Sequence, residues 1–445
     1  MIAKSGSGKS ELLKMLVLLL KTPLFPWETK RCAFRTVIVL DPHGDLVREC
    51  AQQKAWLKTF RQSTRNGKRP RVAVISPNHK RGWTPSLNPF DLKGKRLSFR
   101  QLQVLAQHLT SVFASILGRG SVTLSAHMRT VLVPLFTVLL VMAQTRRHQI
   151  TFHHLERFLD DQRNGDLVAF ARKEIRHEAL QSFFRHLYFE PRLRSTKFAL
   201  QTRLASLLNL ASFTDLFCHP TSTWDLSRLM ESGSLLLIDA DASRLGSLVS
   251  EIFGRTVTAL VQGYAFARTP FQRQRPVYFF IDEAATFTSP DIATMLTQTR
   301  KFGVHLLLAN QLVGQGGGDK TFTDTIMGNT GIKIVGNVGE ASRSAMAKEC
   351  ECSTDQLRGF KVGEFAVKLD NGLPLRKIVL PEYWVGTKSA MSEKQWCSVV
   401  DDQLKHFSRP LNASGESSKT YWKDPPENSA QNMENYVFHP RPLHF

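Results

Sequence analysis

The chain has 445 residues, 42% of them hydrophobic, which suffices for a large core and predicts two domains plus a tail. Its 59 Lys and Arg residues outnumber 38 Asp and Glu residues. The resulting net charge of +21 and pI near 9.9 favour a polyanionic partner, nucleic acid or an acidic membrane face, over a merely basic soluble protein. Six irregularly spaced cysteines exclude a disulfide framework, and Cys350 and Cys352 lack the C-x-x-C spacing of a zinc site, so a reducing cytoplasm fits best.

The sequence shows no signal peptide. Its longest apolar stretch, residues 131–143, is shorter than the ~20 residues that a bilayer-spanning helix needs, and it contains Pro134. We therefore expect a buried helix there.

Residues 3–10 read AKSGSGKS, which is the phosphate-loop pattern G-x-x-x-x-G-K-[ST] with Ala3 in place of the first glycine. Glycines in the loop let backbone N–H groups turn toward a phosphate, Lys9 supplies a cation for the β- and γ-phosphates, and Ser10 supplies a hydroxyl for Mg²⁺. The residues predicted to bind nucleotide are Lys4, Ser5, Gly6, Ser7, Gly8, Lys9 and Ser10. The alternative is an ordinary Gly/Ser turn before a helix.

A phosphate loop ordinarily follows a β-strand, yet only Met1 and Ile2 precede this one. We therefore expect either that the first strand is missing, with any membrane anchor before it, or that the start has been misplaced.

The region before residue 97 alternates strand and helix patterns. Residues 36–40 and 72–75 are short apolar runs, typical of strands buried on both faces of a parallel sheet. The first run leads into Asp41, His43 and Asp45, which belong either to a site or only to local turn chemistry.

From residue 97 to 229 helical periodicity replaces strand patterns and predicts an all-helical insertion. Its cations and interleaved aromatics are Arg172, Lys173, Arg176, Arg185, Arg192, Arg194, Lys197 and Arg203, with Phe183, Phe184, Tyr188, Phe189 and Phe198. Such residues can follow a nucleic-acid backbone. The alternative is that the aromatics are core and the cations form a solvated face.

The second half of the chain returns to alternating patterns. Further strands are expected at residues 234–239, 277–281, 304–309, 332–335 and 365–369, with helices over 245–267 and 291–302. The strand at 277–281 delivers Asp282 and Glu283 to its carboxyl end, where α/β sheets bind ligands. In a P-loop ATPase such an Asp organises Mg²⁺ and the Glu polarises the attacking water, although many core strands end in an acid.

Taken in order, the motifs resemble those of one protein family. They are the phosphate loop, LDPHGDL at 40–46, LNPFDL at 87–92, LLLIDA at 235–240, FFIDEAATF at 279–287, RKFGVHLLLANQ at 300–311 and MGNTGIKIV at 327–335. The set is similar to the FtsK–HerA superfamily of ring-shaped DNA-translocating ATPases. Within it, the TraG/TraD-like coupling proteins of type IV secretion and conjugation are the nearest match, over about residues 1–380.

The resemblance implies an α/β fold: a RecA-like P-loop core with a doubly wound, mainly parallel sheet and an inserted all-α domain. The expected parts are residues 1–96 and 230–383 for the nucleotide-binding domain, 97–229 for the insertion, and 384–445 for a polar, mostly disordered tail.

The resemblance also implies roles for single residues. Lys9 and Ser10 would bind phosphate and Mg²⁺, Asp282 would organise Mg²⁺, and Glu283 would activate water. Gln311 would sense the γ-phosphate, and Arg300 would act as an arginine finger on the neighbouring subunit's nucleotide, although an arginine at a helix end often only complements the helix dipole.

These roles predict an ATP-hydrolysing DNA translocase of conjugative or type IV secretion transfer. Its expected partners are the DNA backbone, other copies of the chain in a hexameric ring, and relaxase and secretion-channel proteins. It would lie in the cytoplasm at the inner-membrane face and reach the membrane only through a segment absent from this chain. Two alternatives are a cytosolic HerA-like DNA-processing or packaging motor, and a truncated, non-hydrolysing relic that binds DNA or a partner.

Overall fold

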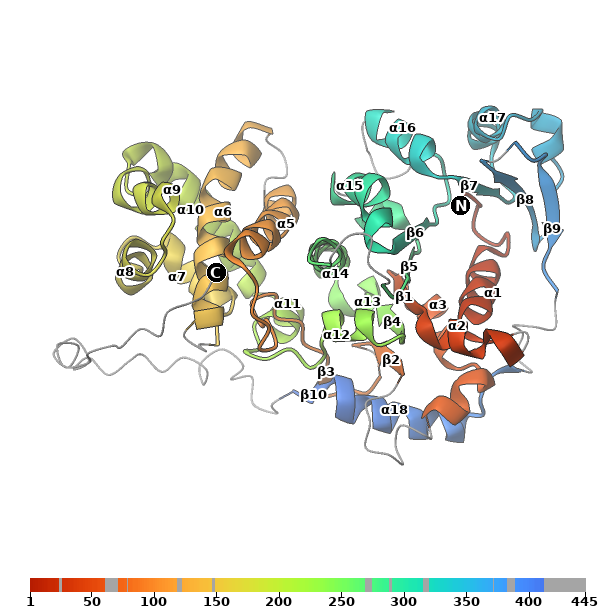
Figure 1. The fold of residues 1–445 in the computed structure, drawn as a ribbon, viewed down its shortest axis with the longest axis horizontal. Helices are drawn as coiled ribbons and strands as arrows, with labels where there is room; N and C mark the ends of the chain where they lie inside the picture. Colours follow the sequence, from red (N-terminus) through yellow and green to blue (C-terminus); the bar gives the residue numbers. More distant parts are fainter. Residues whose placement is uncertain are drawn as a thin grey trace. The chain divides into compact units, whose positions relative to one another are not determined.

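The computed structural model describes residues 1–23, 26–60, 71–77, 79–117, 122–145, 149–268, 274–287, 290–314, 320–370, 372–381 and 389–411 (Figure 1). The last part of the predicted tail, residues 412–445, lies outside the described residues.

The centre of the fold is a five-stranded sheet with the order β2-β4-β1-β5-β6. Its strands are β1 Thr36–Asp41, β2 Val72–Ile75, β4 Leu235–Asp239, β5 Val277–Ile281 and β6 Val304–Leu308. Every pairing in it is parallel, which confirms the predicted parallel sheet. Strands β1, β2 and β4 are fully buried because their continuous apolar runs face helices on both sides.

Helices cover both faces of this sheet (Figure 1). On one face Val37 and Val39 of β1 pack with residues of α1 Lys9–Lys21 and α3 Asp45–Ala51. On the other face the intervening residues of β1 join a core that includes α14 Ser247–Phe266. This alternation follows from the two-residue period of a strand.

The remaining helices around the sheet are short. They are α2 Thr29–Phe34, α12 Leu226–Glu231, α13 Ala242–Leu245, α15 Pro290–Gln298, α16 Lys320–Asn329 and α17 Glu340–Glu349, with 3-10 turns at Pro26–Glu28, Lys54–Trp56, Ala284–Phe287, Thr299–Phe302 and Thr354–Leu357.

A second sheet is antiparallel and has the order β7-β8-β9, with β7 Ile332–Val335, β8 Glu364–Leu369 and β9 Arg376–Val379. The sequence predicted β7 and β8 but not β9, whose residues are mostly exposed. Ile2 forms parallel bridges to Asn310 and to Val335, so the first residues of the chain lie between the two sheets.

The described residues of the predicted insertion form helices joined by loops, with no strand among them. Its helices are α5 Phe99–Leu117, α6 Val122–Thr145, α7 Phe152–Leu159, α8 Gly165–Lys173, α9 Glu178–Ser182, α10 Pro191–Leu208 and α11 Ala211–Phe217, with a π-helical turn at Phe183–Leu187. Helix α6 contains Pro134 and passes through the core. Its span His127–Thr145 is the one described helix long and apolar enough to cross a membrane, and 61% of its most apolar stretch is buried inside the protein. The predicted buried helix is therefore confirmed.

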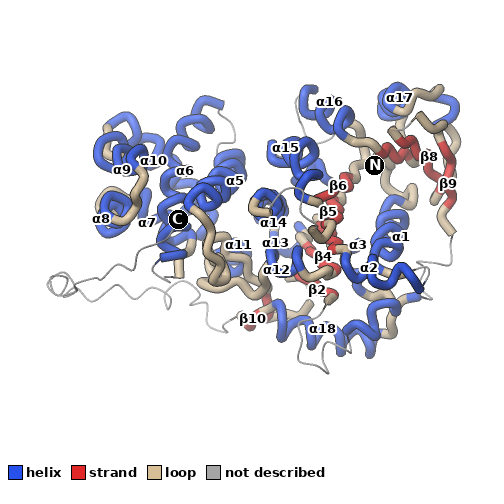
Figure 2. The backbone as a smooth tube through the Cα atoms, viewed as in Figure 1, coloured by secondary structure: helices blue, strands red, loops and turns tan. Residues whose placement is uncertain are grey.

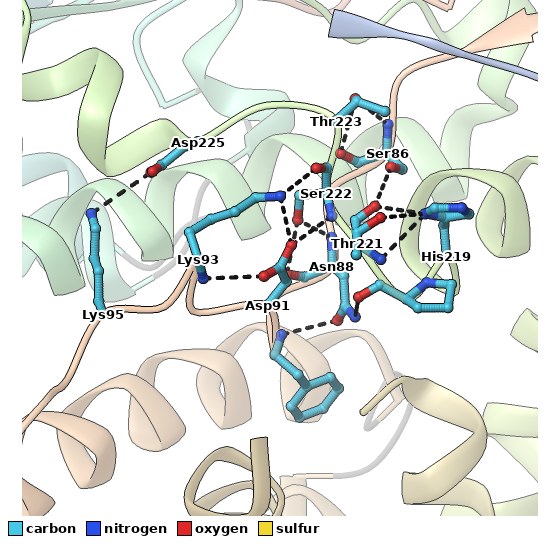
Figure 3. Close-up of polar contacts among 12 residues, drawn as sticks. Ser86, Asn88, Asp91, Lys93, Lys95, His219, Thr221, Ser222, Thr223 and Asp225 are labelled. Atoms are coloured by element: carbon cyan, nitrogen blue, oxygen red, sulfur yellow. Dashed lines mark hydrogen bonds and ion pairs between the residues drawn. The ribbon is translucent and has the colours of Figure 1, made fainter. Parts of the chain in front are cut away.

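The two chain segments that lead into and out of the helical insertion are tied together (Figure 3). Asn88 is buried, and its side-chain amide donates to the carbonyls of Ile150 at 2.7 Å and Pro220 at 3.0 Å. The backbone N–H of Ser222 donates to Asp91 Oδ2 at 2.7 Å, and its hydroxyl accepts the Asn88 N–H at 2.9 Å. The base of the insertion is thus closed by side chains of the segment LNPFDL.

Part of the predicted disordered tail is structured instead. Helix α18 Glu393–Phe407 packs beside β2, as the tube view also shows (Figure 2), and β10 Arg409–Pro410 pairs with β3 Trp83–Thr84. The fully buried Gln403 accepts a hydrogen bond from the backbone N–H of Val74 at 2.8 Å, on the edge strand of the parallel sheet. The predicted tail therefore starts too early, because a helix with a mostly polar outer surface covers an otherwise open strand edge.

Candidate nucleotide site

The phosphate loop has the backbone that its glycines predict. Gly6 and Gly8 have φ angles of +74° and +89°, a region that L side chains rarely adopt. Gly8 is the N-cap of α1, and no side chain caps this helix end. The helix N-terminus therefore keeps its positive dipole end available for an anion.

A loop beside β8 closes over the phosphate loop. The backbone N–H of Gly363 donates to the carbonyl of Ser7 at 3.0 Å, and a Cβ atom on Gly8 would lie 3.0 Å from the same nitrogen. The Ser7 hydroxyl donates to the Lys4 carbonyl at 2.6 Å. These contacts hold the loop in shape and require glycine at position 8.

The methyl group of Ala3, which replaces the first glycine of the motif, has a place in the core. Ala3 is fully buried and clusters with Leu12 and Phe365. A Cβ atom on Gly336 would come within 2.8 Å of the Ala3 Cβ atom. A glycine at 336 therefore provides the space that alanine at 3 takes up.

Lys9 joins the loop to the two predicted carboxylates. Its Nζ atom makes an ion pair with Asp282, and it lies 2.7 Å from Glu283 Oε1. All three side chains are buried. Burial opposes the charged form of Lys9, but the charges and hydrogen bonds of Asp282 and Glu283 outweigh it and raise the lysine pKa.

Glu283 occupies an unusual position immediately after β5. Its φ angle is +43°, and its carboxylate accepts hydrogen bonds from Lys9 and, at 2.9 Å, from Gln311 Nε2. Both bonds use Oε1. The second oxygen, Oε2, is buried and has no hydrogen-bond partner among the described residues. A buried carboxylate oxygen without a donor is unfavourable, so this atom is suited to hold a water molecule.

Asn310 was not singled out from the sequence, although it belongs to the segment that ends in Gln311. Its Oδ1 accepts the backbone N–H of Ala285 at 2.8 Å. This bond fixes the turn after Glu283 against the end of β6. The sequence signal was a polar pair directly after an apolar strand.

The structure thus brings Lys9, Asp282, Glu283 and Gln311 together, and Ser10 follows Lys9 in the first turn of α1. Arg300 lies elsewhere. It sits in the 3-10 turn that precedes β6, whereas Glu283 follows the parallel strand β5, so the two residues lie beyond opposite ends of the sheet, roughly 16 Å or more apart. Arg300 does not reach the nucleotide loop of its own chain.

The turn after β1 is explained by local chemistry. Asp41 accepts the backbone N–H groups of His43 and Val47 at 2.9 and 3.2 Å, and burial raises its pKa to about 6. Neighbouring Asp239 accepts the hydroxyl of Ser76 at 2.6 Å. These carboxylates support the edge of the sheet on which Asp282 lies.

The basic and aromatic residues of the helical insertion divide into two groups. Phe183, Phe184 and Tyr188 are buried, and Lys197 pairs with Asp161 inside the domain. Phe198, by contrast, is 71% exposed. The arginines that are exposed on α10 and in the π-helical turn Phe183–Leu187 are Arg185, Arg192 and Arg194.

The donor set fits a nucleotide with magnesium. Asp282 and Ser10 offer the carboxylate and hydroxyl oxygens that Mg²⁺ prefers, and the orphaned Glu283 Oε2 lies at the same place. No group of three His, Cys, Asp or Glu residues that would hold a metal alone occurs in the described part of the chain. The ion would therefore be shared with phosphate oxygens.

Comparison with known proteins agrees with this arrangement. A family model described as "TraM recognition site of TraD and TraG" matches residues 276–348, which include Asp282, Glu283 and Gln311. No curated protein sequence matches the chain.

Among solved structures, the unbound bacterial conjugative coupling protein TrwBdeltaN70 has a TM-score of 0.59 at 14% identity, covering 88% of this chain and 86% of its own. TrwB in complex with ADP and Mg²⁺ gives 0.56 at 14% identity, with 88% and 87% covered. VirB4 of Thermoanaerobacter pseudethanolicus gives 0.50 at 16% identity, with 88% and 90% covered. The predicted resemblance to conjugation coupling proteins is thereby confirmed for the fold and for the matched segment.

Proposed function

We propose that this protein is the ATP-hydrolysing motor of conjugative or type IV secretion DNA transfer, acting as a coupling protein. The observation that carries the proposal is that the side chains of Lys9, Asp282, Glu283 and Gln311 contact one another at one end of the parallel sheet. The likeness to TrwB, of which structures with ATP and GTP analogues are known, supports nucleotide as the ligand.

Each residue then has a defined task. The loop N–H groups and Lys9 bind the phosphates. Ser10 and Asp282 would hold Mg²⁺, which would supply positive charge against the phosphate oxygens. Glu283 orients a water molecule through Oε2 and accepts its proton. Gln311 holds Glu283 in place by a hydrogen bond and senses the γ-phosphate. Since Arg300 lies at the far end of the sheet, we assign it to the nucleotide of an adjacent copy in a ring.

Hydrolysis would move DNA, bound through its phosphates, and the net charge of +21 supplies the attraction. Exposed Arg192, Arg194 and Phe198 are candidate contacts to the strand. The matched family segment favours a further protein partner of the relaxosome on residues 276–348. We place the protein in the cytoplasm, at the inner-membrane face.

The test is ATP hydrolysis with and without single- and double-stranded DNA, on the unaltered chain and on Lys9→Ala and Glu283→Gln. We expect DNA-stimulated turnover that falls by roughly 10²-fold or more in both variants, with nucleotide binding lost in the first and kept in the second. Lys348→Ala and Glu174→Gln, at exposed positions, are the matched controls.

Turnover that survives Glu283→Gln would contradict the assigned role of this residue. Absence of turnover in the unaltered chain, with salt-sensitive DNA binding that Lys9→Ala does not change, would contradict the motor and favour a non-hydrolysing DNA-binding protein.

A further inference from the structure

The chain segment that leads into β8 lies directly against the phosphate loop, and we name its residues 360–363 the β8 loop. Its last residue, Gly363, donates its N–H to the Ser7 carbonyl at 3.0 Å. Its first residue, Phe360, has a buried side chain, and its carbonyl accepts the Asn337 side-chain amide at 3.3 Å. Both ends of the β8 loop are therefore fixed by hydrogen bonds.

The middle of the β8 loop is held as well. The Lys361 N–H donates to Glu364 Oε2 at 2.9 Å, and the Lys361 carbonyl accepts the Glu364 N–H at 3.1 Å. Asn337 connects the β8 loop to the start of the phosphate loop, because its own carbonyl accepts the Lys4 N–H at 2.9 Å. The shape of the β8 loop is therefore set by the protein's own contacts.

Val362 lies between these anchored residues and leaves its apolar side chain open. It is 75% exposed, more than any other large apolar side chain in the described part of the chain. A single exposed valine is ordinary on a protein surface. This one is held next to Gly363, and a Cβ atom on Gly8 of the phosphate loop would lie only 3.2 Å from the Gly363 Cα atom. An apolar surface is thus fixed at the edge of the phosphate loop.

The phosphate loop also has a direction. Lys9 contacts Glu283 beyond β5, so the γ-phosphate of a bound nucleotide would face the β5 side. Ile2 bridges Asn310 beyond β6 and Val335 of β7, so β5 and β8 lie on opposite sides of the chain that enters the loop. Because the nucleoside is attached at the other end of the triphosphate, it would leave the loop on the β8 side.

We propose that Val362 contacts the base of the bound nucleotide and that the β8 loop supports this contact, an inference that rests on the proposed function. A valine side chain has no hydrogen-bonding group, so it would pack against the flat face of the base and not read its edge. The N–H and carbonyl groups of Lys361 and Gly363 are already engaged within the protein. The contact would therefore favour a nucleoside triphosphate over an inorganic polyphosphate through apolar surface.

The experiment measures binding to the full chain with Mg²⁺, so it does not depend on hydrolysis. Titration calorimetry compares two ligands: adenylyl imidodiphosphate, a non-hydrolysable ATP analogue, and tripolyphosphate, which lacks ribose and base. Val362→Ser removes apolar surface at the proposed contact, whereas Val362→Trp adds a flat surface for stacking.

Val379 of β9 provides the matched controls Val379→Ser and Val379→Trp. It is also a mostly exposed valine, at 65%. Its neighbours Ile378 and Leu380 pack against the core cluster of Phe365 beside the phosphate loop, so Val379 points to the opposite face of the β8–β9 hairpin. A general effect of replacing an exposed valine would appear in both pairs of variants.

We expect Val362→Ser to weaken binding of the ATP analogue about fivefold and Val362→Trp to strengthen it roughly threefold or more. Tripolyphosphate affinity, and both affinities of the Val379 variants, should stay within about twofold of the unaltered chain. Unchanged analogue affinity in both Val362 variants would overturn the proposal, and so would an equal change for tripolyphosphate. Failure of both ligands to bind the unaltered chain would instead contradict the nucleotide site of the proposed function, and the role of Val362 with it.

Discussion

Lys9 Nζ lies 2.7 Å from Glu283 Oε1, although 274 positions separate the two residues in the chain. Without phosphate, the lysine is held by the carboxylates that would otherwise hold metal and water. Bound phosphates would draw Lys9 away and leave Glu283 Oε1 with Gln311 alone. Under the proposed function, the ion pair would therefore link occupation of the loop to the state of Glu283.

Removal of this lysine should destabilise the nucleotide-free protein. In Lys9→Ala, Asp282 and Glu283 keep two buried negative charges without a cation, which we expect to cost about 3 kcal/mol in the free energy of unfolding. Adding Glu283→Gln to Lys9→Ala should restore part of this loss. Denaturant unfolding of the single and double variants measures both terms, and a double variant no more stable than Lys9→Ala would contradict the account.

The close packing of Ala3 against Gly336 can be tested by adding a methyl group at position 336. Gly336→Ala should lower stability by roughly 1–3 kcal/mol and weaken nucleotide binding, because its Cβ atom meets the Ala3 Cβ atom and the Phe365 ring at 2.8–3.0 Å. Gly339→Ala, which has open space around the added atom, is the matched control.

Adding Ala3→Gly to Gly336→Ala should recover part of the lost stability, since it removes one of the two clashing methyl groups. Thermal unfolding and titration with a fluorescent ATP analogue report the two effects. Loss of the same size in Gly339→Ala would show that the site is merely sensitive to glycine replacement.

Asn88 should be a major determinant of stability at the base of the helical insertion. Asn88→Ala removes the donors to Ile150 and Pro220 and the acceptor for the Phe90 N–H, so buried backbone groups lose their partners. We expect a loss of about 2–4 kcal/mol in the free energy of unfolding. Asn209→Ala, at an exposed helix end, should change it by less than about 0.5 kcal/mol.

Asp41 should make stability depend on pH. Its pKa is raised from 3.8 to about 6 by burial, so the folded state disfavours the charged form. Below about pH 4 the residue is protonated in both states and causes no loss. As pH rises from about 4 to about 6, ionisation of the unfolded chain destabilises the fold by up to about 3 kcal/mol.

Asp41→Asn removes this titration, so its stability relative to the unaltered chain should rise across the same pH range. The exposed Asp401→Asn should show no such trend. Urea unfolding at several pH values between 3.5 and 7 provides the comparison, and parallel curves for the unaltered chain and Asp41→Asn would contradict the assignment.

Much of the parallel sheet could be predicted because each of its strands coincides with a short apolar run in the sequence. Strands β2, β5 and β7 have the predicted bounds, since each is a short apolar run ended by polar or glycine residues. The carboxyl-end placement of Asp282 and Glu283 followed from the same pattern. Their contact with Lys9 was implied by the family resemblance and not by any local signal.

Other features depend on tertiary contacts that no local pattern reveals. Strand β9 has the sequence RKIV and lies at a solvent-exposed edge, so it lacks an apolar signature. Helix α18 was assigned to a disordered tail because its buried positions are few and include Gln403. The space for Ala3 comes from Gly336, far along the chain. The roles of Arg300 and Gln311 stay predictions.

One hydrophobic core runs without interruption from the sheet into the helical insertion, from Ile38 of β1 through Leu260 of α14 and Leu109 of α5 to Phe136 of α6. Two parts with separate cores would melt in separate steps, whereas a shared core makes partial unfolding expose apolar surface on both sides. Heating should therefore give a single calorimetric transition for residues 1–411. A force applied to the insertion would therefore be transmitted to the parallel sheet through these packed side chains.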